Sequence, residues 1–81
     1  MYYVYVLKSK KDNKHYIGYT NNLKRRFEEH NQSKNASTKH RVPFELIYYE
    51  AYSTKLLAIR RERKLKKFKN SYTQLMKRIY E

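Results

Sequence analysis

Hydrophobic and polar positions in three separate runs of this chain predict three β-strands. The first run, residues 1–8, is apolar on both of its faces, so we expect it to be the central strand of a sheet. The second run, residues 14–20, is more polar, which is typical of a strand near an edge. The third run, residues 44–52, follows Pro43, which ends any helix before it.

A first helix is predicted after the second strand, opened by Asn21 or Asn22 and ending between positions 31 and 33. Three residues at the i, i+4, i+7 spacing form its expected inward stripe: Leu23, Phe27 and His30. Residues 31–41 then lack any periodicity and are rich in Asn, Ser and Lys, which predicts a loop. This cationic loop is either a mobile surface segment or a flexible arm that contacts phosphates.

Two more helices are predicted after the third strand. Ser53 or Thr54 caps the first of them, and Asn70 or Ser71 caps the second. The expected inward stripe of the first consists of Leu56, Ala58, Ile59, Leu65 and Phe68. The expected stripe of the second consists of Tyr72, Leu75, Met76 and Ile79, and we expect it to close the core.

These elements predict an α/β protein of the α+β type, in the order β-β-α-β-α-α. The three strands can share one antiparallel sheet, flanked by the helices. Eighty-one residues are expected to form a single domain, residues 1–81. A chain of this size buries only roughly 60–65% of its unfolded surface, so the core should be thin.

The net charge gives information about the binding partner of the protein. Twenty Lys and Arg against seven Asp and Glu give a net charge of +13, which favours a polyanionic partner, with nucleic acid first. An anionic membrane surface is the alternative, but no basic helix here carries a Trp- or Phe-rich apolar face. The densest run of cations is Arg60, Arg61, Arg63, Lys64, Lys66, Lys67 and Lys69.

The absence of cysteine excludes disulfides and thiolate metal sites, and it fits a reducing cytoplasm. No apolar run approaches the ~18 residues of a membrane span. The first residues lack the pattern of a signal peptide. The sequence therefore predicts a cytoplasmic protein without a membrane anchor.

Several polar residues fall where apolar ones are expected. Tyr5 shares a strand face with Tyr3, and Tyr16 shares one with Gly18, so a hairpin would bring the two tyrosine-bearing faces together. Tyrosine also simply suits half-buried strands. Arg26 falls on or beside the inward face of its helix, where its side chain could also extend past Phe27 to the surface.

Glu62 is a further polar residue on an apolar stripe. It lies three residues after Ile59 and three before Leu65, so a helix places it on the same face as both. A buried carboxylate must be paired or bound to a cation. By spacing alone, a salt bridge to a neighbouring Arg or Lys and a functional role are equally good interpretations.

Two tyrosine triplets make the sequence resemble a known family. Tyr3-Val4-Tyr5 and Tyr16-Ile17-Gly18 are separated by ten residues, as are the two triplets that name the GIY-YIG nuclease superfamily. Tyr3 replaces the glycine of the first triplet. The following segment, YTNNLKRRFEEHN, looks like the family's third motif, with Arg26 at the arginine position and His30 four residues later. The chain is most similar to the small stand-alone bacterial members of the YhbQ type.

The resemblance implies a metal-dependent endonuclease that hydrolyses DNA phosphodiester bonds. Glu62, in the local pattern LAIRRE, matches the metal-binding glutamate of the family and would bind one Mg²⁺ or Mn²⁺. Arg26 would stabilise the charge that grows on the phosphate. Tyr5 or Tyr16 would position or deprotonate the attacking water, with His30 nearby, and the sequence does not choose between the two tyrosines.

A phenol is a poor base at neutral pH unless a nearby cation lowers its pKa. Lys14, two residues before Tyr16, or the metal itself could do so. The residues expected to contact phosphates are Lys14, Arg25, Lys39, Arg41 and the seven cations of residues 60–69. Without a further reading domain, the nuclease is expected to select DNA structure rather than sequence, in DNA repair or recombination.

Two other functions stay open on the sequence alone. A non-catalytic nucleic-acid binding module would keep the same fold and charge. A structural protein could instead use the basic surface to meet an acidic partner. RNA is left open as a substrate, and the sequence names no protein partner.

Overall fold

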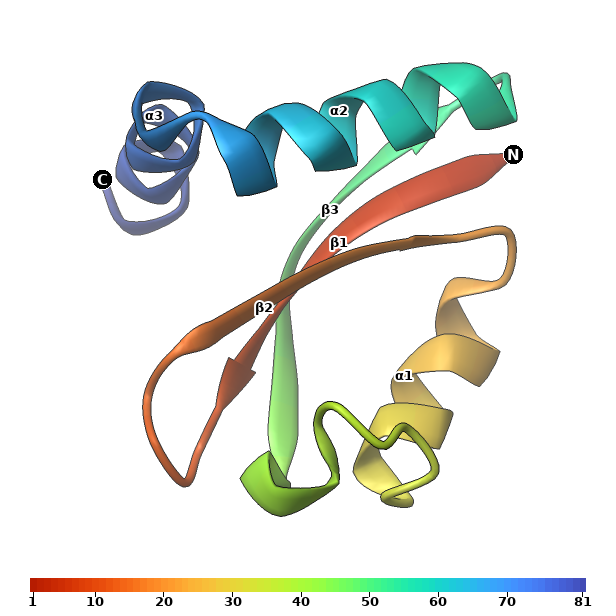
Figure 1. Ribbon diagram of the computed structural model, residues 1–81, viewed down its shortest axis with the longest axis vertical. Coiled ribbons are helices and arrows are strands. Elements are labelled where there is room, and N and C mark those ends of the chain that lie inside the picture. Colours follow the sequence, from red (N-terminus) through yellow and green to blue (C-terminus); the bar gives the residue numbers. More distant parts are fainter.

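The computed structural model describes residues 1–81 and contains one three-stranded antiparallel sheet. Its strands are β1 (Tyr2–Ser9), β2 (His15–Thr20) and β3 (Phe44–Tyr52), in the spatial order β2-β1-β3. The prediction of a central first strand and an edge second strand is confirmed. One face of the sheet carries α1 and the other carries α2 and α3 (Figure 1).

The helices follow in the predicted order. They are α1 (Leu23–Asn31), α2 (Lys55–Lys67) and α3 (Lys69–Tyr80), and a short 3-10 helix, η1 (Lys39–Arg41), precedes β3. The order β-β-α-β-α-α is therefore confirmed, with η1 as an addition. No helix is both long enough and apolar enough to cross a membrane.

The alternation of side chains along β1 divides the core into two parts. Val4 and Val6 point to one face and pack with residues of α2 and α3, including Leu65. Tyr5 and Leu7 point to the other face and pack with residues of α1 and β3. Helices therefore cover both faces of β1.

Side-chain caps begin two of the three helices. The Asn22 side chain accepts a hydrogen bond from the Arg25 backbone N–H at 3.1 Å, and Thr54 accepts one from the Leu57 N–H at 3.3 Å. Both caps are among the predicted candidates.

The predicted cap of the third helix is wrong. Only Phe68, with an extended backbone, separates α2 from α3, and it makes no side-chain cap. Asn70 and Ser71 therefore already lie in the first turn of α3.

The predicted stripe of α2 is wrong at both of its ends. Ala58 and Leu65 are buried, seven residues apart, and define the face that meets the sheet. Leu56 precedes Ala58 by two residues, about 200° around the helix, and is 55% exposed. Phe68 is 51% exposed because the helix has already ended there. The predicted stripe of α3 is confirmed, with Leu75 fully buried.

The segment between α1 and β3 is fastened at two points. The Asn31 side chain accepts a hydrogen bond from the Phe44 N–H at 2.6 Å and donates one to the Phe44 carbonyl at 3.2 Å. Thr38 is fully buried, directly before η1. The region predicted as a loop thus contains a short helix and an internal anchor.

The cap of α2 distinguishes between the two predicted candidates. Replacing Thr54 with alanine leaves the Leu57 N–H without its partner and should lower the free energy of unfolding by about 1 kcal/mol. Ser53→Ala is the matched control, because the Ser53 side chain makes no capping bond. Urea unfolding of both variants measures the difference, and equal effects would contradict the assignment.

Candidate active site

The glycine of the second triplet allows the Tyr5 ring on β1 to lie over the neighbouring strand β2. Gly18 is directly opposite Tyr5 in the register of β1 and β2. A Cβ atom on Gly18 would lie 2.7 Å from Cζ of Tyr5, closer than side chains tolerate, and nearer still to the hydroxyl. It would also lie 3.2 Å from Cε2 of Tyr16. Only glycine therefore lets both rings occupy this position.

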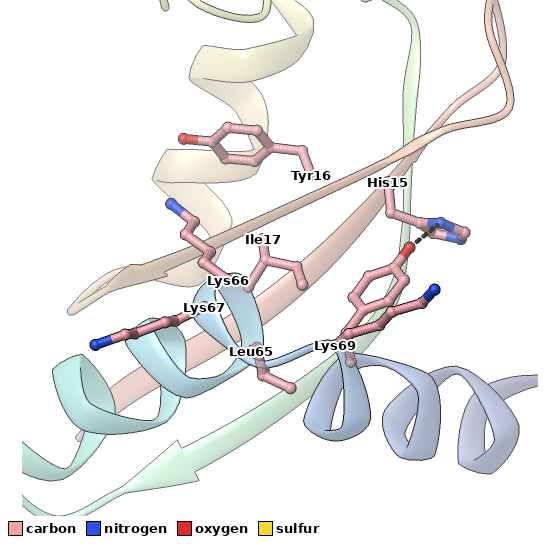
Figure 2. A pocket seen from close by; sticks show the side chains of 8 residues that line it. His15, Tyr16, Ile17, Leu65, Lys66, Lys67 and Lys69 are labelled. Carbon is pink, nitrogen blue, oxygen red and sulfur yellow. Dashed lines mark hydrogen bonds between the residues drawn. The ribbon is translucent and has the colours of Figure 1, made fainter.

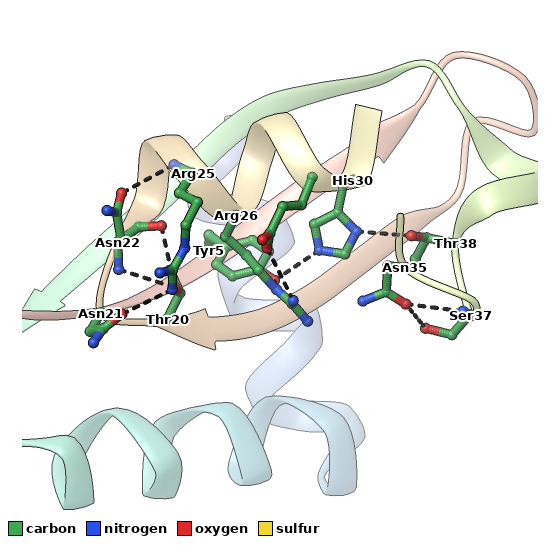
Figure 3. Close-up of polar contacts among 11 residues, drawn as sticks. Tyr5, Thr20, Asn21, Asn22, Arg25, Arg26, His30, Asn35, Ser37 and Thr38 are labelled. Atoms are coloured by element: carbon green, nitrogen blue, oxygen red, sulfur yellow. Dashed lines mark hydrogen bonds and ion pairs between the residues drawn. The ribbon is translucent and has the colours of Figure 1, made fainter. Parts of the chain in front are cut away.

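The Tyr5 hydroxyl is the centre of a buried hydrogen-bond chain (Figure 3). It accepts a hydrogen bond from Nε of Arg26 at 3.4 Å and lies 3.0 Å from Nε2 of His30. On the other side of the imidazole, Nδ1 of His30 lies 2.8 Å from Oγ1 of Thr38. The chain joins β1, α1 and the segment before η1.

Burial fixes the protonation of this chain at neutral pH. It raises the pKa of Tyr5 to about 12, with smaller contributions that include the negative charge of Glu62. Burial, followed by the positive charge of Arg26, lowers the pKa of His30 to about 4. Tyr5 therefore keeps its proton and donates it to a neutral His30, whose Nδ1–H in turn donates to Thr38.

Arg26 lies at the surface end of this series of hydrogen bonds. One of its terminal nitrogens lies 3.5 Å from a carboxylate oxygen of Glu29, and its Nε is held by Tyr5. Its second terminal nitrogen has no protein partner. The side chain is held in place but still presents free donors to the outside, as a phosphate-binding arginine requires. The alternative prediction, an arginine that merely extends to the surface past Phe27, does not account for the bond to Tyr5.

Tyr16 lies beside this chain, but its surroundings differ from those of Tyr5. Its ring centroid is 4.9 Å from that of His30, and its hydroxyl has no hydrogen-bond partner in the protein. Nζ of Lys66 lies 5.6 Å from the ring centroid. Lys14, the cation predicted to act on Tyr16, lies in the exposed turn before β2 and makes no such contact.

Glu62 approaches from the other layer of the molecule. Its side chain is 16% exposed, and Nζ of Lys66, one turn further along α2, lies 3.5 Å from its carboxylate. No second acidic or histidine side chain gathers with it into a three-ligand cluster. A single carboxylate beside a basic surface is compatible with Mg²⁺ or Mn²⁺, because Mg²⁺ keeps several waters and needs only one or two protein carboxylates.

Two basic hollows lie along the edge strand β2, one lined by residues of its end and the other by residues of its first half. The first, the arginine hollow, has a volume of about 420 Å³ and is lined by Tyr2, Tyr19, Thr20, Asn21, Arg25, Arg26 and Lys55. The second, the lysine hollow, has a volume of about 520 Å³ and is lined by His15, Tyr16, Ile17, Leu65, Lys66, Lys67, Lys69 and Tyr72 (Figure 2). Arg26 opens into one hollow and Tyr16 into the other.

The structure does not bring all the predicted phosphate contacts together. Arg41 is paired with Asp12 at 2.8 Å, and this hydrogen bond is the main reason that the pKa of Asp12 falls to about 2. Arg61 forms two hydrogen bonds with the Glu50 carboxylate, at 2.9 and 3.3 Å. Lys39 is exposed on η1. A separate hollow on α2 is lined by Leu57, Arg60, Arg61, Arg63 and Lys64.

Sequence reasoning missed two residues of the site. Thr38 holds His30 but lies in a segment without periodicity, so no pattern could single it out. Lys55 lines the arginine hollow from the first turn of α2, and only its charge distinguished it. Tyr3, the departure from the family pattern, packs its ring at 6.0 Å from that of Tyr49 in an edge-to-face arrangement.

Comparison with known proteins identifies the family of this chain. Residues 1–77 match the model of the GIY-YIG catalytic domain. The chain is 46% identical over 81 residues to the UPF0213 protein SH2523 of Staphylococcus haemolyticus, covering 99% of this chain and 95% of that protein. It is 44% identical over 75 residues to the UPF0213 protein YazA of Bacillus subtilis, covering 91% and 75% of the two chains.

A solved structure agrees as well. The solution structure of the UPF0213 protein BH0048 from Bacillus halodurans superposes with a TM-score of 0.60 at 36% identity, over 95% of this chain and 84% of that one. The fold and the site define a domain of the GIY-YIG nuclease superfamily. The chain belongs to this family, and its relatives among small bacterial proteins carry the name UPF0213.

The close approach of Gly18 and Tyr5 can be tested by a double-mutant cycle. Gly18→Ala should lower the free energy of unfolding by about 1–3 kcal/mol, because the added methyl group collides with the Tyr5 ring. In a Tyr5→Leu background the collision disappears, and the same substitution should cost much less. Urea unfolding measures both, and additive effects would contradict the proposed contact.

Acid should weaken the fold through His30. Its folded pKa of about 4 lies below the usual 6.5, so the unfolded chain binds the extra proton between these values. Stability should therefore fall as the pH drops from about 6.5 to 4, by on the order of 3 kcal/mol. Urea unfolding across this range should show a flatter profile for His30→Gln. The control His40→Gln, at an exposed histidine, should follow the wild type, and a His30→Gln profile as steep as the wild type would refute the assignment.

Proposed function

We propose that this protein is a metal-dependent endonuclease that hydrolyses DNA phosphodiester bonds, selecting DNA structure rather than sequence, in repair or recombination. One observation carries the proposal. Side chains of three elements converge near the edge strand β2: Tyr5, Arg26 and Glu62 from β1, α1 and α2. Membership of the nuclease superfamily supports the same reaction class.

The two tyrosines take different roles in this proposal. Tyr5 is buried, protonated and bonded on both sides, so it positions Arg26 and His30. Tyr16 has a free hydroxyl at the border of the lysine hollow, so it is the tyrosine that contacts the attacking water. His30 is fully buried and acts as a positioning residue that supports both rings.

The cations and the metal ligand complete the proposed site. Arg26 donates hydrogen bonds from its free N–H groups to the phosphate and stabilises the charge that develops there. Glu62 would hold one Mg²⁺ or Mn²⁺, which when bound polarises the phosphate and stabilises the leaving oxygen. Lys66, which pairs with Glu62 in this structure, would turn to a phosphate instead.

The substrate strand runs along β2 in this proposal, between the arginine hollow and the lysine hollow. Arg25 and Lys55 contact phosphates on one side of the scissile bond, and Lys66, Lys67 and Lys69 on the other. Arg60, Arg63 and Lys64 line the separate hollow on α2 and add long-range attraction. The contacts of Lys14 and Lys39 and the cytoplasmic location stay predictions, and Arg41 and Arg61 are already paired.

A non-catalytic nucleic-acid binding module is the second candidate function. The observation that favours it is the ion pair between Lys66 and Glu62, because a carboxylate that only neutralises a lysine needs no metal. Such a module would keep both hollows and their affinity for DNA. The two functions predict different effects of a Glu62 substitution on DNA cleavage.

Glu62→Gln should separate the two functions. It keeps the shape of the side chain but removes the charge that holds a cation, so cleavage should fall by at least about 100-fold. DNA affinity should be unchanged or higher, because a negative charge is removed. Cleavage is measured on labelled duplex, single-stranded, flap and four-way-junction DNA with Mg²⁺, Mn²⁺ or EDTA.

Glu45→Gln is the matched control for this experiment, because Glu45 is exposed at the start of β3, away from the site. It should cleave like the wild type. Cutting that persists in Glu62→Gln, or in EDTA, would overturn the metal mechanism. Binding without any cutting by the wild type would favour the binding module.

A further inference from the structure

The lysine hollow has more apolar and aromatic lining than phosphate binding alone requires. The core residues Ile17 and Leu65 border it, and His15 and Tyr72 contribute aromatic rings. Its volume of about 520 Å³ lies within the range of small-ligand sites. Figure 2 shows Lys66 reaching toward Tyr16 from below, so the hollow lies directly beside the proposed catalytic residues.

Hydrogen bonds hold the aromatic side of the hollow in place. The Tyr72 hydroxyl lies 3.0 Å from Nδ1 of His15, and the Tyr80 hydroxyl lies 2.8 Å from Nε2 of the same ring. Burial, then the positive charges of Lys8 and Arg41, lower the pKa of His15, so its ring is neutral at pH 7. Two phenols from α3 thus fix a flat, uncharged ring on β2.

We propose that the lysine hollow takes one unpaired nucleotide of single-stranded DNA, with its base against Tyr72 and His15 and its phosphates on the lysines. This inference rests on the proposed function and names the kind of DNA that the site selects. The lysines are Lys66, Lys67 and Lys69, at the junction of α2 and α3. The nucleotide lies next to the scissile phosphate, on the Tyr16 side.

The combination of lining groups favours an unpaired base over a duplex. A phosphate needs only the cations, whereas the aromatic rings and apolar side chains suit the face of a base. In a duplex both faces of each base are covered by its neighbours, so the aromatic side of the hollow would have no partner. A flap, a single-stranded end or a gap supplies a base that is free to stack.

The experiment measures binding in EDTA, so its result does not depend on cleavage. Single-stranded and blunt duplex oligonucleotides of equal length carry a 2-aminopurine base, whose fluorescence reports stacking on aromatic rings. Wild-type protein should bind the single strand more tightly and quench the fluorescence. Tyr72→Leu removes the ring but keeps an apolar side chain, and it should weaken single-strand binding about 5- to 20-fold.

Three further variants separate the hollow from general effects. Tyr72→Phe keeps the ring and should retain most of the affinity and the quenching. Lys69→Gln should weaken single-strand binding more than duplex binding, whereas Lys77→Gln, on α3 outside the hollow, should weaken both slightly and equally. Tyr49→Leu, an exposed tyrosine on β3, should leave binding unchanged. A thermal unfolding scan of Tyr72→Leu shows whether this variant is folded at the assay temperature, and so identifies any loss of binding that comes from unfolding.

Each outcome bears on one proposal. Equal binding of single strand and duplex, or equal loss for both with Tyr72→Leu, overturns the nucleotide site while the nuclease proposal stands. Absence of binding to either DNA overturns both proposals. Stacking that depends on Tyr72, together with a Glu62→Gln protein that still cleaves, supports the nucleotide site and rejects only the proposed metal ligand.

Discussion

The fold depends on one buried hydroxyl, that of Tyr5. A polar group with almost no exposed surface must be fully hydrogen-bonded, and this one takes its partners from His30 and Arg26 on a single helix. The helix can meet the sheet only where these bonds form, and Thr38 fixes the imidazole from behind. Gly18 provides the space for the ring on the neighbouring strand. The same contacts that seat α1 on the sheet therefore orient the arginine of the site.

The second layer is positioned by a different polar group, the partly buried carboxylate of Glu50. Glu50 on β3 accepts hydrogen bonds from Arg61 and from the hydroxyls of Tyr48 and Tyr52. Burial opposes its charged form, but these bonds outweigh it and lower the pKa of Glu50. Because Arg61 immediately precedes Glu62, this network fixes the rotation of α2 about its axis. The site is thus assembled across the sheet, from two layers with separate anchors.

Local patterns predicted most of the fold, and they identified most residues of the site but not which of them are buried or already paired. Apolar residues on both faces of the first run identified β1 as central, and the hairpin pattern predicted that the tyrosine-bearing faces of β1 and β2 meet. The pattern could not show that Arg61 faces Glu50, because a run of cations looks alike on every side of a helix until the packing selects a face. It also could not distinguish Tyr5 from Tyr16, since burial separates them and burial is a tertiary property. Thr38 was invisible for the same reason.

The packing of Tyr3 has a consequence for how sequences of this family diverge. Its ring occupies the place where the family motif has glycine, and it rests edge-on against Tyr49 of the neighbouring strand. Tyr49 lies diagonally across from Tyr3, because the register pairs Tyr3 with Ala51, so a relative that keeps glycine there offers no ring for an aromatic residue at the position of Tyr49. Substitutions at these two sites should therefore have been acquired together during evolution. In this chain, the contacts of the triplet's first tyrosine thus reach the third strand.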